Sequence, residues 1–259
     1  MAGFLFDDMI FGPVQSRRLG KSLGINLLPT HSKACSYNCI YCECGWTGNR
    51  RGMNVDLPTR KDIASALEEA ILRLRGSDMQ PDSLTFAGNG EPTMHPEFDG
   101  IINDTIHLRD SLLPTAKVSV LSNGSMIQHP TVFAALRKVD NNIQKLDGGT
   151  EEIIRLINMP LKAFRLSEYV ATLKRFGDNL VIQSLFLRGH LGNRVVDNTS
   201  PEEVKAWLNL VKEINPSYVM IYAIERETPA SGLIRISKDE LDNIAAQVRQ
   251  AGLEAEVYA

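Results

Sequence analysis

Cysteine is scarce in this 259-residue sequence, and outside one short stretch it is absent. All four cysteines lie within ten positions, at Cys35, Cys39, Cys42 and Cys44. Cysteines grouped in this way do not form the spread disulfide framework of small secreted proteins, so we expect a cytoplasmic protein in a reducing compartment. They also lack the distant second ligand pair of structural zinc sites, and zinc is kept only as an alternative.

The sequence also lacks a large excess of positive or negative charge, and it has no long apolar runs. The chain has 28 Lys and Arg against 31 Asp and Glu, a net charge of −3 and a pI of about 6.0. This balance excludes a global basic field that would draw the protein to nucleic acid or to anionic membranes. No apolar run reaches membrane-spanning length, and Asp7 and Asp8 interrupt the apolar start, so we expect neither a membrane partner nor a signal peptide.

What the sequence does contain is a regular alternation of strand and helix patterns. Apolar β-rich runs predict strands at 22–28, 83–87, 117–121, 142–147, 180–187 and 217–223, with a short tail strand at 254–258. Helical spacing and capping signals predict helices at 59–75, 97–113, 130–139, 151–158, 166–176, from 200, and 237–251.

This alternation predicts an α/β fold with a parallel sheet and right-handed crossovers. Six βα units are too few to close an eight-stranded barrel, so we expect an open, partial (βα)6 TIM-type barrel with helices outside. We expect one domain over 1–259, with an N-terminal loop extension at 1–21, a barrel core at 22–252 and a C-terminal tail at 253–259. The cysteines follow the first predicted strand, where α/β barrels place their chemistry.

The spacing of the cysteines indicates a metal cluster. Thiolates favour zinc and iron–sulfur clusters, and a closed [4Fe–4S] cluster normally takes four cysteines. Cys35-x3-Cys39-x2-Cys42 supplies three, which leaves one iron open to a small molecule that carries an amine and a carboxylate. Cys44 is either a fourth ligand that closes the cluster or a small buried thiol, and the sequence leaves both alternatives open.

Cys35-x3-Cys39-x-Tyr41-Cys42 is similar to the signature of the radical S-adenosylmethionine (SAM) superfamily. The resemblance implies a [4Fe–4S] cluster on the three cysteines, with SAM chelating the open iron. It also implies an external one-electron reductant, flavodoxin- or ferredoxin-like, and cleavage of SAM to methionine and a 5′-deoxyadenosyl radical that abstracts hydrogen from a substrate. The partial barrel matches the family's core, and Tyr41 resembles the aromatic position beside the adenine.

A second motif follows the second predicted strand. Gly88-Asn89-Gly90-Glu91-Pro92 resembles the family's Gly-Gly-Glu motif, which implies that Gly90 and Glu91 bind the amino group of SAM. Asn89 departs from the motif, because it stands where the family has the first glycine. The alternative is an ordinary turn that leads into a helix.

Polar side chains at other strand ends are further candidates for SAM binding. Lys145 and Asp147 could serve the SAM carboxylate and the ribose hydroxyls, or could form a structural ion pair. Ser122 and Asn123 end the third strand in a Ser-Asn-Gly sequence that is also ordinary turn chemistry. Of the neighbours Gln183 and Ser184, one is expected to face the barrel interior. Catalytic residues proper remain unknown from the sequence.

Four arginines are candidates for substrate binding. Arg17 and Arg18 precede the first predicted strand, and Arg50 and Arg51 follow the cysteines. They could bracket the mouth of the barrel and bind an anionic substrate, or they could be solvated surface residues.

The resemblance extends over nearly the whole chain. The segments 11–20, 88–93, 145–147 and 182–189 look like the uncharacterised prokaryotic branch of radical SAM proteins that is related to wyosine-base synthesis enzymes. The wyosine enzymes hold a second cluster on upstream cysteines that this chain lacks, so their pyruvate-condensing reaction does not carry over. Three functions remain open: a modifier of RNA or another anionic molecule, an activase that makes a glycyl radical on a partner protein, and a non-catalytic iron–sulfur module.

Overall fold

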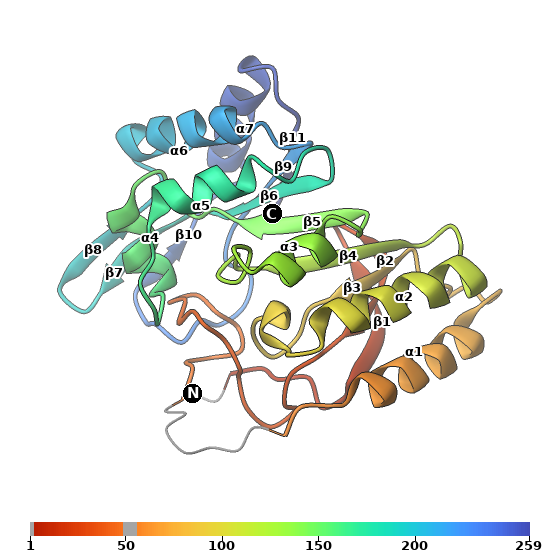
Figure 1. The fold of residues 1–259 in the computed structure, drawn as a ribbon. Coiled ribbons are helices and arrows are strands. Elements are labelled where there is room, and N and C mark those ends of the chain that lie inside the picture. Colours follow the sequence, from red (N-terminus) through yellow and green to blue (C-terminus); the bar gives the residue numbers. More distant parts are fainter. Residues whose placement is uncertain (1–2, 49–55) are drawn as a thin grey trace. The chain divides into compact units, whose positions relative to one another are not determined.

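The computed structural model describes residues 3–48 and 56–259 (Figure 1). The chain forms two compact units. The N-terminal unit is Leu5–Ser36 and Thr47–Asn142, and the C-terminal unit is Met1–Phe4, Tyr37–Trp46 and Ile143–Ala259. The cysteine stretch therefore belongs to both, since Cys35 lies in the first and the other three cysteines lie in the second. The expected single domain stays a prediction.

The N-terminal unit is a small open sheet with helices. Its strands run in the order β1-β2-β3-β4, with β1 antiparallel to β2 and the other neighbours parallel. The elements are β1 (Ile10–Ser16), β2 (Gly20–Ile25), α1 (Arg60–Leu74), β3 (Ser83–Phe86), the 3-10 helix η1 (Pro92–Met94), α2 (Phe98–Leu112), β4 (Lys117–Ser122) and α3 (Pro130–Leu136). The helices α1 and α2 lie side by side (Figure 1).

The C-terminal unit repeats the pattern and adds a hairpin. Its main strands run in the order β5-β6-β9-β11, and a separate antiparallel sheet has the order β10-β7-β8. The elements are β5 (Asn141–Lys145), α4 (Glu151–Asn158), α5 (Leu166–Leu173), β6 (Leu180–Leu185), β7 (Leu187–Leu191), β8 (Arg194–Asp197), α6 (Pro201–Ile214), β9 (Tyr218–Tyr222), β10 (Leu233–Arg235), α7 (Lys238–Gln250) and β11 (Ala255–Tyr258).

The capping signals begin the helices where the sequence predicts. The Thr59 side chain accepts a hydrogen bond from the main chain of Asp62 at the start of α1. Ser237 and Glu240 form a reciprocal capping box on α7. These caps satisfy main-chain donors that have no partner inside the helix, which is why the helices begin there.

Each unit buries its own apolar face. In the N-terminal unit Leu67, Ile71, Phe86 and Ile102 are fully buried, and in the C-terminal unit Trp207 is. The strands β3 and β6 are buried along their whole length, as expected for parallel strands covered by helices. The core therefore holds the carboxyl ends of the strands in fixed positions.

The loop extension predicted at 1–21 is wrong over 10–16, where β1 forms, and at its end, where β2 begins at Gly20. Gly12 and Pro13 suggested a loop, but β1 is the end strand of its unit and the pairing register shifts between Phe11 and Val14. An edge strand tolerates a proline at such an irregularity, since it needs ladder hydrogen bonds on one side only.

The strand predicted at 180–187 is confirmed over 180–185, but its end is wrong, because the chain leaves the main sheet at Phe186. β6 ends at Leu185, and β7 pairs with β8 across the turn at Gly192 and Asn193. A Gly-Asn pair between two β-rich runs is a hairpin signal that the sequence did offer. The predicted tail strand is confirmed as β11, which joins the sheet beside β9.

The fold class is α/β, of the open partial TIM-barrel type that the alternation of strands and helices predicts. Over the described residues, no helix combines the length and the apolar character that crossing a membrane requires. Most of the polar residues predicted for the site lie at or just after the carboxyl ends of β3, β4 and β5, and two lie within β6.

Candidate functional site

In the N-terminal unit, the residue before Cys35 pairs with the loop that follows β3. The Ala34 amide donates to the Asn89 carbonyl at 2.7 Å, and the Glu91 amide donates to the Ala34 carbonyl at 2.9 Å. Gly90 makes this approach possible, because its φ is 142° and a Cβ there would lie 1.8 Å from the Ala34 oxygen. The motif glycine therefore fixes the main chain that leads into Cys35.

Asn89, which departs from the Gly-Gly-Glu pattern, holds neighbouring segments together. Its buried side chain accepts a hydrogen bond from the Phe6 amide and donates to the carbonyls of Phe6 and Pro29, each at 2.9 Å. Among described non-glycine residues only Met159 and Asn215 have positive φ, so Asn89 needs no special conformation. The asparagine adds an anchor without disturbing the pairing of the loop.

Ser122 and Asn123 both donate hydrogen bonds to the side chain of Glu91. Its carboxylate accepts hydrogen bonds from the Ser122 hydroxyl at 2.9 Å, the Asn123 amide at 2.6 Å and the Thr93 amide at 3.2 Å. The side chain is 1% exposed. A carboxylate that is buried and engaged in this way joins the carboxyl ends of β3 and β4.

Burial raises the pKa of Glu91 above its usual value and outweighs the hydrogen bonds from Thr93, Asn123 and Ser122, which lower it. The folded protein thus holds this proton more tightly than the unfolded chain does. Its contribution to the free energy of unfolding therefore falls as the pH rises from the ordinary glutamate range through the raised pKa.

Glu91→Gln is expected to remove this fall, because the variant has no proton to lose. The difference in free energy of unfolding, variant minus wild type, should increase with pH across that interval. Urea unfolding followed by circular dichroism, from about pH 4 to about pH 8, measures it. Glu213→Gln, at an exposed glutamate paired with Lys174, is the control. Parallel curves for wild type and Glu91→Gln would contradict the prediction.

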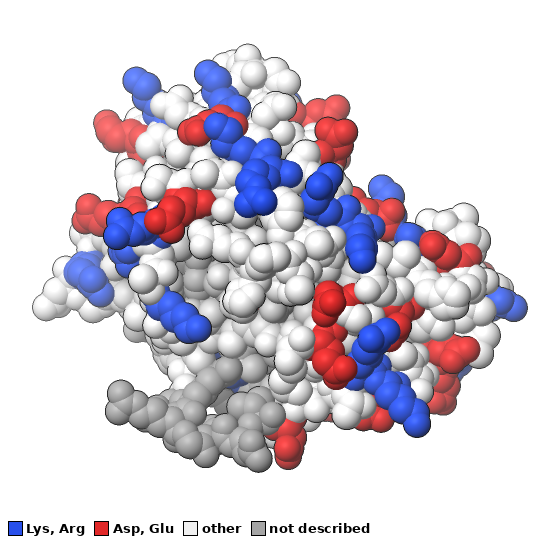
Figure 2. Space-filling model, viewed as in Figure 1, with Lys and Arg blue, Asp and Glu red and all other residues white. Residues whose placement is uncertain are grey.

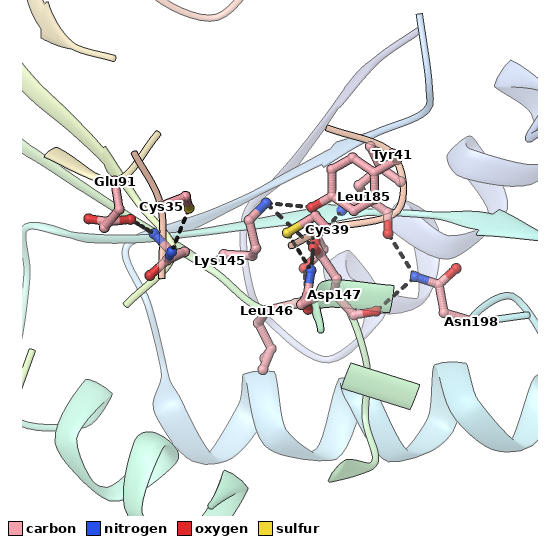
Figure 3. Close-up of polar contacts among 12 residues, drawn as sticks. Cys35, Cys39, Tyr41, Glu91, Lys145, Leu146, Asp147, Leu185 and Asn198 are labelled. Carbon is pink, nitrogen blue, oxygen red and sulfur yellow. Dashed lines mark hydrogen bonds and ion pairs between the residues drawn. The ribbon is translucent and has the colours of Figure 1, made fainter. Parts of the chain in front are cut away.

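Asn123 also contacts the first cysteine. Its side-chain Nδ2 lies 3.4 Å from Cys35 Sγ and 3.0 Å from the Ser36 hydroxyl. Figure 3 shows Cys35 near Glu91. Cys35 is half-buried. The N-terminal unit therefore gathers Cys35, Gly90, Glu91, Ser122 and Asn123, all of which were predicted as site residues.

In the C-terminal unit, Tyr41, Lys145 and Asp147 form one network (Figure 3). The Tyr41 hydroxyl donates to Asp147 Oδ2, and Lys145 Nζ lies 2.6 Å from that hydroxyl and 3.4 Å from Asp147 Oδ2. Lys145 also lies over the Tyr41 ring, 5.1 Å from its centroid. The ion pair that the sequence left as an alternative for Lys145 and Asp147 is present, although Asp147 follows β5 rather than ending it.

Tyr41 and Lys145 keep their protons at neutral pH. Burial raises the pKa of Tyr41, and the charge of Asp147 raises it further. Burial lowers the pKa of Lys145, but the charge of Asp147 outweighs it, and that pKa lies well above its usual value. Tyr41 therefore stays a neutral donor, while Lys145 stays charged.

Asp147 is saturated by donors from several elements. Besides Tyr41, its carboxylate accepts from Asn158 Nδ2 at 2.7 Å and from the Leu185 amide at 2.9 Å. Asn198 donates to its main-chain carbonyl at 2.8 Å. Asp147 thus orders the ends of β5, β6 and α4 around Tyr41.

The end of α4 holds the segment around Cys39, which the sequence did not predict. The Asn38 amide donates to the Asn158 carbonyl at 3.1 Å, and the Ile40 amide donates to the Ile157 carbonyl at 2.9 Å. The side chain of Asn158 lies with its Nδ2 3.5 Å from Cys39 Sγ. Carbonyls in the last turn of a helix have no partner within it, so they are available to this loop. In the sequence, an asparagine at the end of a helix is common, so nothing there marked Asn158 as a site residue.

Gln183 and Ser184 lie on opposite faces of β6. The Ser184 hydroxyl donates to the Leu146 carbonyl and accepts from Trp207 Nε1 at 2.9 Å, so Ser184 faces helix α6. Successive side chains of a strand alternate between faces, so Gln183 points away from α6. Gln183 is therefore the candidate of the two for the face that was predicted to point to the barrel interior.

Of the arginines predicted for substrate binding, the two that the structure describes do not join these groups. Arg17 and Arg18 lie in the turn at the amino end of β2, whereas Cys35 follows its carboxyl end. Arg50 and Arg51 lie outside the described residues. Arg226, which was not predicted from the sequence, instead pairs with Glu43, the residue after Cys42.

A cavity of about 380 Å³ in the C-terminal unit reaches Cys42. Arg226 in its wall donates to Glu43 at 2.9 Å and lies 5.4 Å from the centre of the Phe4 ring. Glu227 also lines it. The volume is within the range of small-ligand sites.

The cysteine thiols are of the donor type that holds iron–sulfur clusters. Cys39 is buried, and Cys35, Cys42 and Cys44 are half-buried, with amide donors on two of the sulfurs. Within the described ranges, no three His, Cys, Asp or Glu side chains are grouped so as to hold a single metal ion. In an iron–sulfur cluster each thiolate binds a different iron, so the thiolates do not have to meet at one point as the ligands of a single ion do.

Among models of known protein families, the one described as "Radical SAM superfamily" matches residues 30–231. Among curated proteins, the chain is 31% identical over 239 residues to a "UPF0026 protein" of Helicobacter pylori, covering 90% of this chain and 71% of the relative. It is also 30% identical over 233 residues to a protein named "GTPase Obg" in Brachyspira hyodysenteriae, covering 90% of this chain but 32% of that protein. The chain thus spans about a third of the latter.

Solved structures share the fold at low sequence identity. A radical SAM methyltransferase from Sphaerobacter thermophilus matches with a TM-score of 0.68 and 15% identity, covering 92% of this chain and 65% of that chain. Streptococcus suis SuiB bound to S-adenosylmethionine matches at 0.66 and 14%, covering 91% and 50%. Archaeal TYW1 matches at 0.52 and 13%, covering 89% and 72%.

Proposed function

This chain belongs to the radical SAM superfamily, and from that premise we propose that it cleaves SAM reductively and abstracts hydrogen from a substrate. It is an enzyme of that class, and the class implies a [4Fe–4S] cluster and SAM. The observation that carries the proposal is the cysteine stretch itself, in which the segments around Cys35 and Cys39 are each held by main-chain hydrogen bonds.

Cys35, Cys39 and Cys42 are the proposed cluster ligands. Thiolates bind iron–sulfur clusters, and three of them leave one iron for SAM. A bound cluster and SAM supply one-electron cleavage of a carbon–sulfur bond and a 5′-deoxyadenosyl radical, with the electron coming from a flavodoxin- or ferredoxin-like protein. Cys44 is proposed as a non-ligand, because Cys42-x-Cys44 offers too little backbone for two irons.

The residues predicted to contact SAM are divided by their exposure. Gly90, Tyr41, Lys145 and Gln183 are proposed as contacts. Glu91, Asp147 and Ser184 are assigned to positioning, because each is at most 1% exposed and is engaged by several groups of the protein. Ser122 and Asn123 act through Glu91 and Cys35.

The substrate is proposed to be RNA or another molecule with an anionic group. Arg226 supports this, because its ion pair with Glu43 is exposed and such pairs contribute at most about 1 kcal/mol. A substrate anion could therefore replace Glu43 at little cost. Glu43 and Glu227 in the cavity wall carry carboxylates, which oppose a general attraction of anions. Figure 2 likewise shows charges of both signs on the face in view.

The finer family assignment, to the branch related to wyosine-base synthesis, is supported by homologues named UPF0026 and by the distant likeness in fold to TYW1. The pyruvate-condensing reaction is not proposed, since all four cysteines lie in one stretch. A cytoplasmic location is proposed because clustered thiols that bind iron need a reducing compartment.

Anaerobic reconstitution with iron and sulfide, followed by an assay for 5′-deoxyadenosine with dithionite as reductant, tests the proposed function. We expect about one cluster per chain and formation of 5′-deoxyadenosine from SAM. A cluster that forms but never cleaves SAM would favour the non-catalytic iron–sulfur module. RNA that copurifies would support the substrate proposal, whereas a copurifying partner enzyme would favour the glycyl-radical activase.

A further inference from the structure

Two asparagine side chains hydrogen-bond to cysteine sulfurs, one in each unit. Asn123 Nδ2 lies 3.4 Å from Cys35 Sγ, and Asn158 Nδ2 lies 3.5 Å from Cys39 Sγ. Sulfur is larger than oxygen, so these distances are those of N–H···S hydrogen bonds. The same chemical group thus meets two of the three proposed cluster ligands.

Asn158 is held so that one N–H must face the sulfur. A primary amide has two N–H donors, and one of them is used by Asp147 Oδ2 at 2.7 Å. Because a carboxylate only accepts, the nitrogen and not the oxygen of the amide points toward it. The main-chain carbonyl of Asn158 meanwhile accepts from Asn38, next to Cys39. Both ends of the contact are therefore fixed.

Asn123 is held in a comparable way. Its Oδ1 accepts from the Ser125 amide at 2.9 Å, and its Nδ2 reaches the Ser36 hydroxyl at 3.0 Å as well as Cys35. Its main-chain amide is bound by Glu91. The side chain is 6% exposed, so little water competes for its donors.

We propose that Asn158 and Asn123 are positioning residues that raise the reduction potential of the cluster, a role that rests on the proposed function. Reduction adds one electron to a cluster whose negative charge is shared with its thiolates. Donors on the sulfurs stabilise the reduced state more than the oxidised one, which shifts the potential upward. Both amides would thereby make it easier for the external reductant to deliver its electron.

Asn158→Leu is expected to lower the midpoint potential, because leucine has a similar size and no donor. The cluster-loaded protein is titrated with dithionite in the presence of redox mediators, and the reduced cluster is followed by electron paramagnetic resonance. At the solution potential at which half of the wild-type clusters are reduced, the reduced fraction in Asn158→Leu should be lower by at least about twofold. Asn123→Leu, in the other unit, should shift the potential in the same direction and gives a second test if one variant fails to fold.

Asn198→Leu is the matched control. Asn198 is equally buried, and its amide donates to the carbonyls of Asp147 and Leu185 but to no sulfur. We expect it to lose stability without a shift in potential. Unchanged potentials in both sulfur-contact variants, or an equal shift in the control, would overturn the inference while leaving the proposed function intact. Failure of the wild-type protein to bind a cluster would instead overturn the proposed function, and with it this role.

Discussion

Cys39→Ala protein, reconstituted with iron and sulfide, is expected to form no 5′-deoxyadenosine from SAM. Loss of even a supporting residue around a metal lowers metal affinity or activity by about 10- to 100-fold, so loss of a ligand should lower the rate by at least about 100-fold. Cys39 is the buried member of the stretch, and Asn38 and Ile40 on either side are bonded to the end of α4. Water or a neighbouring side chain therefore has little room to replace the thiolate.

Cys44→Ala is the matched control for this experiment. It removes a half-buried thiol two residues from Cys42, and we expect it to keep both the cluster and the cleavage of SAM. Iron content and 5′-deoxyadenosine are measured on the same samples. An unchanged rate in Cys39→Ala would remove Cys39 from the ligand set, while loss of the cluster in Cys44→Ala would make Cys44 a ligand.

Asp147→Leu is expected to lower the free energy of unfolding by about 3–5 kcal/mol, because it leaves the buried ammonium of Lys145 without its counter-ion. The Asp147 side chain is 0% exposed and that of Lys145 is 17% exposed. The pKa of Lys145 is raised despite its burial. A lysine whose folded pKa is raised contributes its stability below its unfolded pKa, so the contribution of the pair is fully present at pH 7.

The double variant Lys145→Met with Asp147→Leu separates charge from packing. Apolar replacement of both members of a buried pair is often close to neutral, so the double variant should recover part of the loss. Glu213→Ala, which breaks the exposed pair with Lys174 at 3.0 Å, should change stability by less than about 1 kcal/mol. Urea unfolding at pH 7 measures all three, and an Asp147→Leu variant as stable as Glu213→Ala would contradict the role given to the pair.

Much of the fold follows from the sequence, because helix caps and buried apolar runs are local signals. Thr59 and Ser237 begin their helices as predicted. The elements that were missed depend on distant partners. β1 contains Pro13 and is recognisable as a strand only when it pairs with β2, and β7 leaves the main sheet because β8 and β10 pair with it.

The part of the candidate site that consists of polar residues at strand ends was predictable from the sequence. Glu91, Ser122 and Asn123 were each singled out separately, and the structure brings them together through the hydrogen bonds of one carboxylate. Asn158 was missed because an asparagine at a helix end has many ordinary explanations. Its proximity to Cys39 comes from the way the end of α4 binds the cysteine loop, which no local pattern encodes.

The side chain of Asn89 makes the conformation of one loop depend on a segment 83 residues earlier in the chain. A glycine at this position would leave the Phe6 main chain and the Pro29 carbonyl without those three hydrogen bonds. Replacement of Asn89 by glycine would therefore need a second change that supplies new bonds to the segment around Phe6. The side chain at position 89 is thus constrained by residues far from it in the sequence.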